Sequence, residues 1–477
     1  MTQADGYESP LSGRYASSEM RSIFGARRRI QTWRTLWIEL ARAQRELGLP
    51  ISDAQLAALE RTRDEIDFER AAALERELKH DVMAHIAAWG ERCPEAAGVI
   101  HLGATSYDIV DNADLVLFRE ALHQVARGLA ATLAGLARFA TRTRDLACLG
   151  YTHFQAAQPV TVGRRACLWA QDFLDDLAEV ERLARGMKLR GARGATGTQA
   201  SYLALFGGNA EAVRELDRRF VRACGFERSY AVASQTYPRK LDSKILAALS
   251  GVAESAAKMA TDIRLLSGTG ELLEPRDPHQ VGSSAMPYKR NPMKSERICG
   301  LARFVLGLAT NPPATASAQW LERSLDDSAN RRLVLPEAFL ATDAILRVCG
   351  NVVRGLEPRP TVIARRLAEM MPFFATEDVM MDAAKAGGHR GDLHEALRVH
   401  ALAAWEAVES GRDNDLLARL AADPKFAAAR ARIQSTNRPE QYVGLAREQV
   451  DAFLERELRP ALAAYPEAEQ WETGLAV

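Results

Sequence analysis

The sequence has few cysteines, and they are widely scattered. Its 477 residues include 6 cysteines, at positions 93, 148, 167, 224, 299 and 349, with no C-x-x-C pair and no cluster of Cys and His. Sparse cysteines in a large intracellular chain usually behave as small buried hydrophobic residues. The sequence therefore predicts neither disulfides nor a metal site.

An excess of charge of one sign is also missing. Lys and Arg together number 62, as do Asp and Glu, so the formal net charge is zero. A general nucleic-acid-binding protein needs a basic face, and this balance argues against one while still allowing a local cationic pocket. The chain also lacks a G-x-x-x-x-G-K-[ST] phosphate loop and a strand-borne G-x-G-x-x-G. We therefore expect no bound ATP or NAD, and no other cofactor.

No uninterrupted apolar run reaches the length of a membrane span, although 47% of the residues are hydrophobic. The N-terminal segment has no basic stretch followed by an apolar one. The first absence argues against a membrane protein, and the second against a secretory signal. The sequence predicts a cytoplasmic protein without a membrane partner.

Long helical patterns dominate what is present. Apolar residues recur at three- and four-residue spacing from Thr32 to Leu47, where Gly48-Leu49-Pro50 ends the run. Further alanine- and leucine-rich runs lie near 111–146, 160–190, 209–224, 238–268 and 330–356. Helices this long favour a bundle. We predict an all-α fold with three domains: an N-terminal helical domain (1–105), a central long-helix bundle (106–358) and a C-terminal helical domain (359–477).

One polar stretch between two helical runs carries more chemistry than a connector requires. Residues 282–292 read Gly-Ser-Ser-Ala-Met-Pro-Tyr-Lys-Arg-Asn-Pro. The glycine and the two prolines prevent a regular helix or strand from continuing. On composition alone a polar surface turn explains the stretch about as well as an active-site loop does. The two hydroxyls, the amine, the guanidinium and the carboxamide favour an active-site loop, with Gly282 as a hinge.

The order of these residues resembles the signature G-S-S-x-M-P-x-K-x-N-P of the fumarase/aspartase superfamily of elimination lyases. Its longer form, from Ser283 to Glu296, is similar to that of the adenylosuccinate lyase family in particular. Every fixed position of the pattern is met, and the resemblance extends from Tyr7-Glu8-Ser9-Pro10-Leu11 through Ala386-Gly387-Gly388. It implies a homotetramer whose central helices form a common core, with each active site shared between three subunits.

The resemblance also implies a reaction on a small nucleotide substrate. Members of this family eliminate fumarate from adenylosuccinate, which gives AMP, and from the succinylated aminoimidazole carboxamide ribotide of purine biosynthesis. Such a reaction needs a base for the C–H proton, groups that stabilise the developing carboxylate charge, and an acid for the departing nitrogen. By the resemblance Ser283 is the base, Lys289 and Asn291 stabilise the carboxylate, and His80 binds the substrate.

The acid is assigned through a second motif. Residues 150–159 resemble the T-H-x-Q-x-A-Q motif of the superfamily, with Ala156 where a proline is common, and His153 is its histidine. A histidine titrates near neutrality, which suits an acid. Without the resemblance, His153 is equally explained by backbone hydrogen bonds, and His80 by a solvated helix face. With it, His153 protonates the departing nitrogen.

Several polar breaks supply the remaining expected substrate contacts. Thr105 and Ser106 fit an N-cap as well as a carboxylate contact, and both interpretations can hold. Gly191, Gly194 and Gly197 suit either an anion or a tight connection between helices. Two guanidiniums and a hydroxyl in residues 319–332 suit a phosphate. The substrate-binding residues implied by the resemblance are Arg14, Tyr15, Lys79, Asp81, Thr105, Ser106, Gln235, Asn291, Arg297, Arg323, Ser328 and Arg332, and position 79 departs from the arginine of the relatives.

Two rival interpretations remain. An argininosuccinate lyase-like enzyme shares the signature but has no use for a phosphate site, so Arg323, Ser328 and Arg332 argue against it. A structural protein without catalytic activity on the same scaffold is the other. It predicts loss of the reactive residues, yet Ser283 and His153 are both present.

Overall fold

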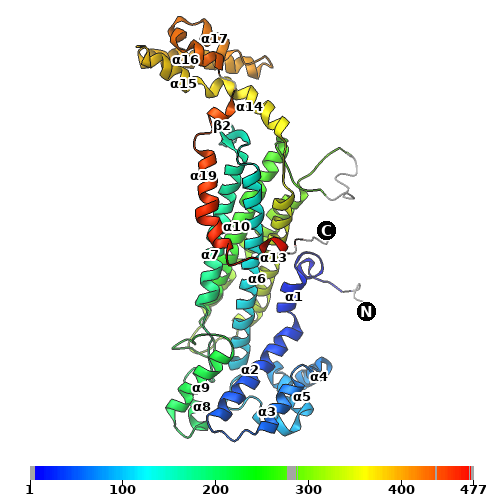
Figure 1. Ribbon diagram of the computed structural model, residues 1–477. Coiled ribbons are helices and arrows are strands. Elements are labelled where there is room, and N and C mark those ends of the chain that lie inside the picture. The colour runs from blue at the N-terminus through cyan, green and yellow to red at the C-terminus, as the bar shows by residue number, and fades with distance from the viewer. Residues whose placement is uncertain (1–5, 277–285, 287, 436–437, 472, 474–477) are drawn as a thin grey trace.

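The computed structural model describes residues 6–276, 286, 288–435, 438–471 and 473 of the chain. Its centre is a bundle of long helices that lie side by side (Figure 1). They share one hydrophobic core, and the all-α prediction is confirmed. Four of the predicted runs, near 111–146, 160–190, 238–268 and 330–356, correspond to helices of this bundle. Its helices are α6 (Ser106–Arg142), α7 (Val162–Gly186), α10 (Lys240–Gly268), α11 (Met293–Leu308) and α13 (Asp327–Gly355).

Small residues let two of these helices approach closely. A Cβ atom on Gly135 of α6 would lie 2.5 Å from Cγ2 of Val353 on α13, and one on Gly128 would lie 3.0 Å from Cδ1 of Leu346. Interiors are packed too densely to absorb such overlaps without movement. Alanine or larger at Gly135 would therefore push α6 and α13 apart.

A second group of helices covers the end of the bundle at the bottom of Figure 1. Its core surrounds the indoles of Trp33, Trp37 and Trp89, each at most 2% exposed. The predicted helix from Thr32 to Leu47 is part of α2. The helices that form or flank this group are α1 (Ser18–Ile23), α2 (Ala26–Glu46), α3 (Asp53–Thr62), α4 (Phe68–Leu78), α5 (Asp81–Arg92), α8 (Ala200–Leu205) and α9 (Ala210–Ala223), the last of which matches the predicted run near 209–224.

His101 belongs to this second core. Its Nδ1 accepts a hydrogen bond of 2.9 Å from the indole N–H of Trp37. Burial lowers the pKa of His101 to about 4. The ring is therefore neutral at pH 7 and supports the fold rather than titrating there.

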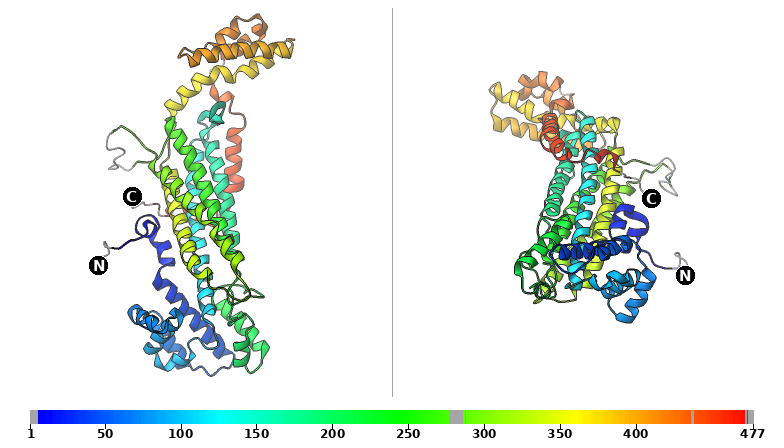
Figure 2. Two further views of the ribbon diagram at one scale, coloured as in Figure 1. Left: turned by 180° about the vertical axis from the view of Figure 1, so that it is seen from behind. Right: turned by 60° about the horizontal axis from the view of Figure 1, so that its bottom comes forward.

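The C-terminal third divides between two places. The helices α15 (Thr376–Lys385), α16 (Arg390–Glu409), α17 (Leu416–Ala422) and α18 (Arg430–Ser435) surround Phe426 in a core of their own, which α14 (Pro360–Phe374) joins to the bundle. The chain then returns, and α19 (Ala446–Phe453) lies beside α7 before α20 (Arg459–Leu462) (Figure 2). The domain boundaries at 105 and 358 stay predictions.

The described strands are short and lie near the upper end of the bundle. β1 (Ala147–Thr152) and β2 (Gln155–Thr161) form an antiparallel hairpin, and β3 (Leu272–Leu273) pairs with β4 (Glu357–Pro358). Residues 150–159, which carry the motif with His153, belong to the β1–β2 hairpin. α11 ends at Leu308. The next helix, α12 (Asn311–Ala318), has prolines in its first turn, where proline is tolerated.

The described part of the chain includes no helix that is both long and apolar enough to cross a membrane. It also includes no group of three or more His, Cys, Asp or Glu side chains placed to hold a metal ion.

Candidate active site

Three of the predicted residues, Lys79, His80 and Asp81, lie at the junction between α4 and α5. Lys79 ends α4 in a left-handed conformation with φ of 54°, which reverses the chain direction. His80 is the N-cap of α5, and its Nδ1 accepts a hydrogen bond of 3.4 Å from the backbone N–H of Met83. The opposite ring nitrogen, Nε2, lies 3.4 Å from Oγ of Ser106 at the start of α6. The His80 ring is thus oriented from both sides.

A pocket of about 480 Å³ opens between these residues and the start of α13. Nη2 of Arg332 lies 3.4 Å from Oδ2 of Asp81 across it, and both side chains are partly exposed. The pocket brings together six predicted residues that no single helix carries. They are Lys79, His80, Asp81, Ser106, Ser328 and Arg332, with Tyr107 beside them.

Arg323 lies on the other side of Tyr107. Its guanidinium carbon is 4.2 Å from the centre of the Tyr107 ring, and it lines an adjacent pocket of about 400 Å³. The backbone N–H of Gln235 donates a hydrogen bond of 3.1 Å to the carbonyl of Glu322, one residue before Arg323. Gln235 and Arg323 are thus neighbours of the first pocket without lining it.

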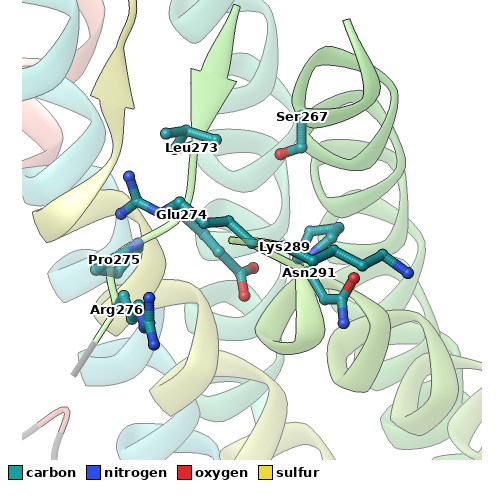
Figure 3. A pocket seen from close by; sticks show the side chains of 9 residues that line it. Ser267, Leu273, Glu274, Pro275, Arg276, Lys289 and Asn291 are labelled. Carbon is teal, nitrogen blue, oxygen red and sulfur yellow. The ribbon is translucent and has the colours of Figure 1, made fainter. Parts of the chain in front are cut away.

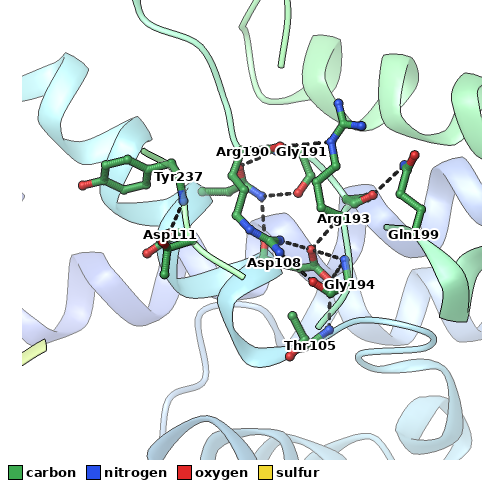
Figure 4. Close-up of polar contacts among 12 residues, drawn as sticks. Thr105, Asp108, Asp111, Arg190, Gly191, Arg193, Gly194, Gln199 and Tyr237 are labelled. Carbon is green, nitrogen blue, oxygen red and sulfur yellow. Dashed lines mark hydrogen bonds and ion pairs between the residues drawn. The ribbon is translucent and has the colours of Figure 1, made fainter. Parts of the chain in front are cut away.

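The start of α6 is held by the carboxylate of Asp108 (Figure 4). This carboxylate pairs with Arg190 and accepts hydrogen bonds from the backbone N–H groups of Thr105 at 2.8 Å, Arg193 at 2.8 Å and Gly194 at 3.1 Å. Thr105 is the N-cap of α6, as one of its two interpretations predicts. The polar atoms of Asp108 therefore connect the helix that carries Ser106 to the glycine-rich loop.

The glycine-rich loop, residues 191–197, thus binds an anion of the chain itself, the Asp108 carboxylate. Gly191, Gly194 and Gly197 have φ of 87°, 75° and 83°, a region that other residues rarely adopt. A Cβ atom on Gly197 would lie 1.7 Å from the carbonyl oxygen of Ala233. The spacing of the glycines serves the fold around Asp108.

The signature stretch is described only in part, and Ser283 lies outside the described residues. Lys289 and Asn291 line a small pocket with Glu274 (Figure 3). The Glu274 carboxylate accepts the backbone N–H groups of Lys294 at 2.8 Å and Ser295 at 2.9 Å. Burial raises the pKa of Glu274. Glu274 therefore caps α11 directly after the signature stretch.

Arg14, Tyr15 and Arg297 form a further group along the bundle. Arg14 and Tyr15 end a short π-helical segment, Leu11–Tyr15. The Arg297 guanidinium carbon lies 5.8 Å from the centre of the Tyr15 ring. Ser17 fixes this segment to α13, because the Asp343 carboxylate accepts its backbone N–H at 2.7 Å.

His153 lies at the turn of the β1–β2 hairpin and is exposed. His153 and Phe154 both have positive φ, 52° and 58°. The hairpin is attached to the end of the bundle, because the Tyr151 hydroxyl donates a 2.5 Å hydrogen bond to Glu271, a buried residue just after α10. Burial raises the pKa of Tyr151 to about 12.

Within one chain, the predicted residues that the structure describes do not form a single site. The pocket with His80 and Ser106 is at the start of α6, whereas the hairpin with His153 follows the other end of that helix (Figure 1). At 1.5 Å per residue, the 37 residues of α6 span about 55 Å. The pocket with His80 includes neither Lys289 and Asn291 nor the group around Tyr15.

Sequence reasoning missed the residues that hold the predicted ones in place. Tyr107 and Asp108 directly follow Ser106, and Asp327 lies within residues 319–332, yet nothing in their spacing shows which side chains turn inward. Glu271 and Glu274 precede the signature stretch and carried no signal of their own. Four of these five residues are buried: Asp108, Asp327, Glu271 and Glu274 are each at most 8% exposed, whereas Tyr107 is partly exposed.

Comparisons with known proteins identify the family of the chain. The family profile described as "Lyase" matches residues 13–307, and the one described as "Adenylosuccinate lyase C-terminus" matches residues 372–453. The adenylosuccinate lyase of Saccharomyces cerevisiae is 45% identical over 471 residues, which cover 98% of this chain and 97% of the relative. That of Schistosoma mansoni is 45% identical over 468 residues, which cover 98% of both chains.

Solved structures show the same fold. A fumarate lyase from Mesorhizobium sp. BNC1 superposes with a TM-score of 0.78 at 25% identity, covering 94% of this chain and 99% of that one. The 3-carboxy-cis,cis-muconate lactonizing enzyme of Pseudomonas putida gives 0.81 at 25% identity, covering 97% and 99%. Together with the family profiles and the nearly full-length relatives, these likenesses show that the chain belongs to the adenylosuccinate lyase family of the fumarase/aspartase superfamily.

Proposed function

We propose that the protein is an adenylosuccinate lyase, which eliminates fumarate from adenylosuccinate to leave AMP. The second substrate is the succinylated aminoimidazole carboxamide ribotide of purine biosynthesis. The observation that carries this proposal is 45% identity to adenylosuccinate lyases over 98% of the chain. The pocket that gathers Lys79 and Arg332 beside His80 agrees with it, because the cations of the lysine and arginine suit an anionic nucleotide.

The chemistry assigns one task to each group. Ser283 removes the proton from the carbon beside one carboxylate, and the electron pair forms the new C=C bond as the C–N bond breaks. His153 gives a proton to the departing nitrogen. Lys289 and Asn291 stabilise the negative charge that develops on the carboxylate. His80, oriented by Met83 and Ser106, binds the substrate.

The protein acts as a homotetramer with shared active sites. The two histidines are far apart within one chain: His80 lies beside the start of α6, and His153 lies beyond its end. A length of about 55 Å is far more than one nucleotide can bridge. Neighbouring subunits therefore complete each site, with His80 from one chain and His153 from another.

The reaction takes place in the cytoplasm on a free nucleotide. This part of the proposal rests on the balanced charge of the chain and on the name of its relatives, not on any described contact. Neither a nucleic acid nor a membrane takes part.

An ultraviolet assay of the purified protein tests the activity. It follows AMP and fumarate formation from adenylosuccinate, with argininosuccinate and fumarate as parallel substrates. We expect turnover of adenylosuccinate alone. Turnover of argininosuccinate instead would keep the elimination chemistry and reject the nucleotide, whereas no turnover of any of them would favour a structural protein without catalytic activity.

A further inference from the structure

Two residues outside the predicted set hold Arg323 in one orientation. Its Nη1 donates a hydrogen bond of 2.8 Å to Oδ1 of Asp327, and its Nη2 donates one of 2.5 Å to the Tyr107 hydroxyl. The Tyr107 ring also lies against the guanidinium, 4.2 Å from its carbon. The guanidinium is therefore fixed at two of its nitrogens and on one face.

Asp327 is itself immobilised from behind. It is fully buried, and its Oδ2 accepts a hydrogen bond of 2.7 Å from Nε of Arg239. Arg239 in turn binds both carboxylate oxygens of Asp111, at 3.0 and 3.2 Å. Asp111, Arg239, Asp327 and Arg323 thus form a row of alternating charges that starts in the bundle. Its bonds prevent the Asp327 carboxylate from turning away from Arg323.

Charge alone does not explain Asp327. An anion beside Arg323 weakens the attraction between Arg323 and a phosphate, so its presence is better explained by orientation than by potential. A guanidinium whose direction is already set loses less entropy when it binds an anion. Asp327 and Tyr107 use two of the five N–H groups of the guanidinium, and Arg323 lines the pocket of about 400 Å³.

Tyr107 links the two predicted parts of the phosphate site. It lines the same pocket as Ser328 and Arg332. On the opposite side it holds Arg323. A change at Tyr107 therefore reaches both Arg323 and the pocket that contains Ser328, without removing either residue.

We propose that Asp327 and Tyr107 are positioning residues that aim Arg323 at the 5′-phosphate of the nucleotide, and so set the preference for a nucleotide over a nucleoside. The inference rests on the proposed function, because it takes a nucleotide as the substrate and the phosphate contact of Arg323 from the family resemblance. It goes further by naming the residues through which that contact acts. Neither is expected to touch the reacting atoms.

The test compares AMP with adenosine, which lacks the phosphate, by isothermal titration calorimetry on the full-length protein. We expect Asp327→Asn to weaken AMP binding by about 10–100-fold and to change adenosine binding by less than about threefold. In kinetics with adenylosuccinate the same variant raises KM and leaves kcat nearly unchanged. Asp326→Asn is the matched control, because Asp326 is the exposed neighbour and bonds to Ser324 and Gln319 instead.

Tyr107→Phe keeps the ring and removes only the hydroxyl, so it decides the question if Asp327→Asn does not fold. Equal weakening of AMP and adenosine, or wild-type affinity for AMP in both variants, would overturn the inference. The proposed function fails separately, if the wild-type protein does not cleave adenylosuccinate. The difference between AMP and adenosine is measured without turnover and still decides the role of Asp327 and Tyr107.

Discussion

Replacing Ser283 or His153 by alanine should lower kcat by about 10²–10⁴-fold, because each variant lacks a group that moves a proton in the elimination. His153 is exposed at a hairpin turn, so its loss should leave the fold intact. The measurement is steady-state turnover of adenylosuccinate, with thermal unfolding as a check on folding. KM should change much less than kcat, because the missing step belongs to the transition state.

Two controls make this result specific. His389→Ala removes a histidine whose side chain is 79% exposed, in the C-terminal part, and should leave kcat within about twofold of wild type. Ser284→Ala should lose less activity than Ser283→Ala, which separates the two adjacent hydroxyls of the signature stretch. Near-wild-type turnover of either main variant would remove its assigned role.

Asp108→Asn should lower the free energy of unfolding by about 3–5 kcal/mol, because it leaves the buried Arg190 guanidinium without its anion. The new amide group would also face backbone N–H groups of Arg193 and Gly194, which need an acceptor. Urea unfolding followed by circular dichroism measures the change.

The matched control for this prediction is Asp53→Asn. Asp53 pairs with Arg45 on the surface and its side chain is 83% exposed, so its loss should cost at most about 0.5 kcal/mol. An Asp108→Asn protein within about 1 kcal/mol of wild type would mean that the network around Asp108 does not support the start of α6.

The long helices were predictable because their signal is local. Apolar periodicity places α10 at 238–268, and the helix spans Lys240–Gly268. The β1–β2 hairpin was not predicted, because its turn residues, His153 and Phe154, adopt positive φ without the glycine or asparagine that usually marks such a turn. Pairing with Glu271 and α14, far along the chain, holds the hairpin instead.

The sequence predicted which residues belong to the candidate site, but not how they are arranged in space. Spacing and resemblance single out His80, Ser106 and Arg332, and the structure brings these three to one pocket. Spacing does not show that Gly194 and Arg190 surround a carboxylate more than 80 residues upstream, since that contact exists only in the folded chain. Spacing also gives no sign that Asp327 matters. It is one of several acidic residues in a polar stretch, and only its burial in the folded chain distinguishes it.

Mixed tetramers test whether each active site is shared between subunits. His80→Ala and His153→Ala proteins, each with little activity, are dissociated together and reassembled in equal amounts. If each site takes residue 80 from one chain and residue 153 from another, about one site in four regains both histidines. Turnover should then rise to about a quarter of the wild-type value, while each variant reassembled alone stays inactive. No recovery, in a mixture where one variant carries a nitrogen-15 label so that native mass spectrometry distinguishes the hybrid tetramers, would contradict the account.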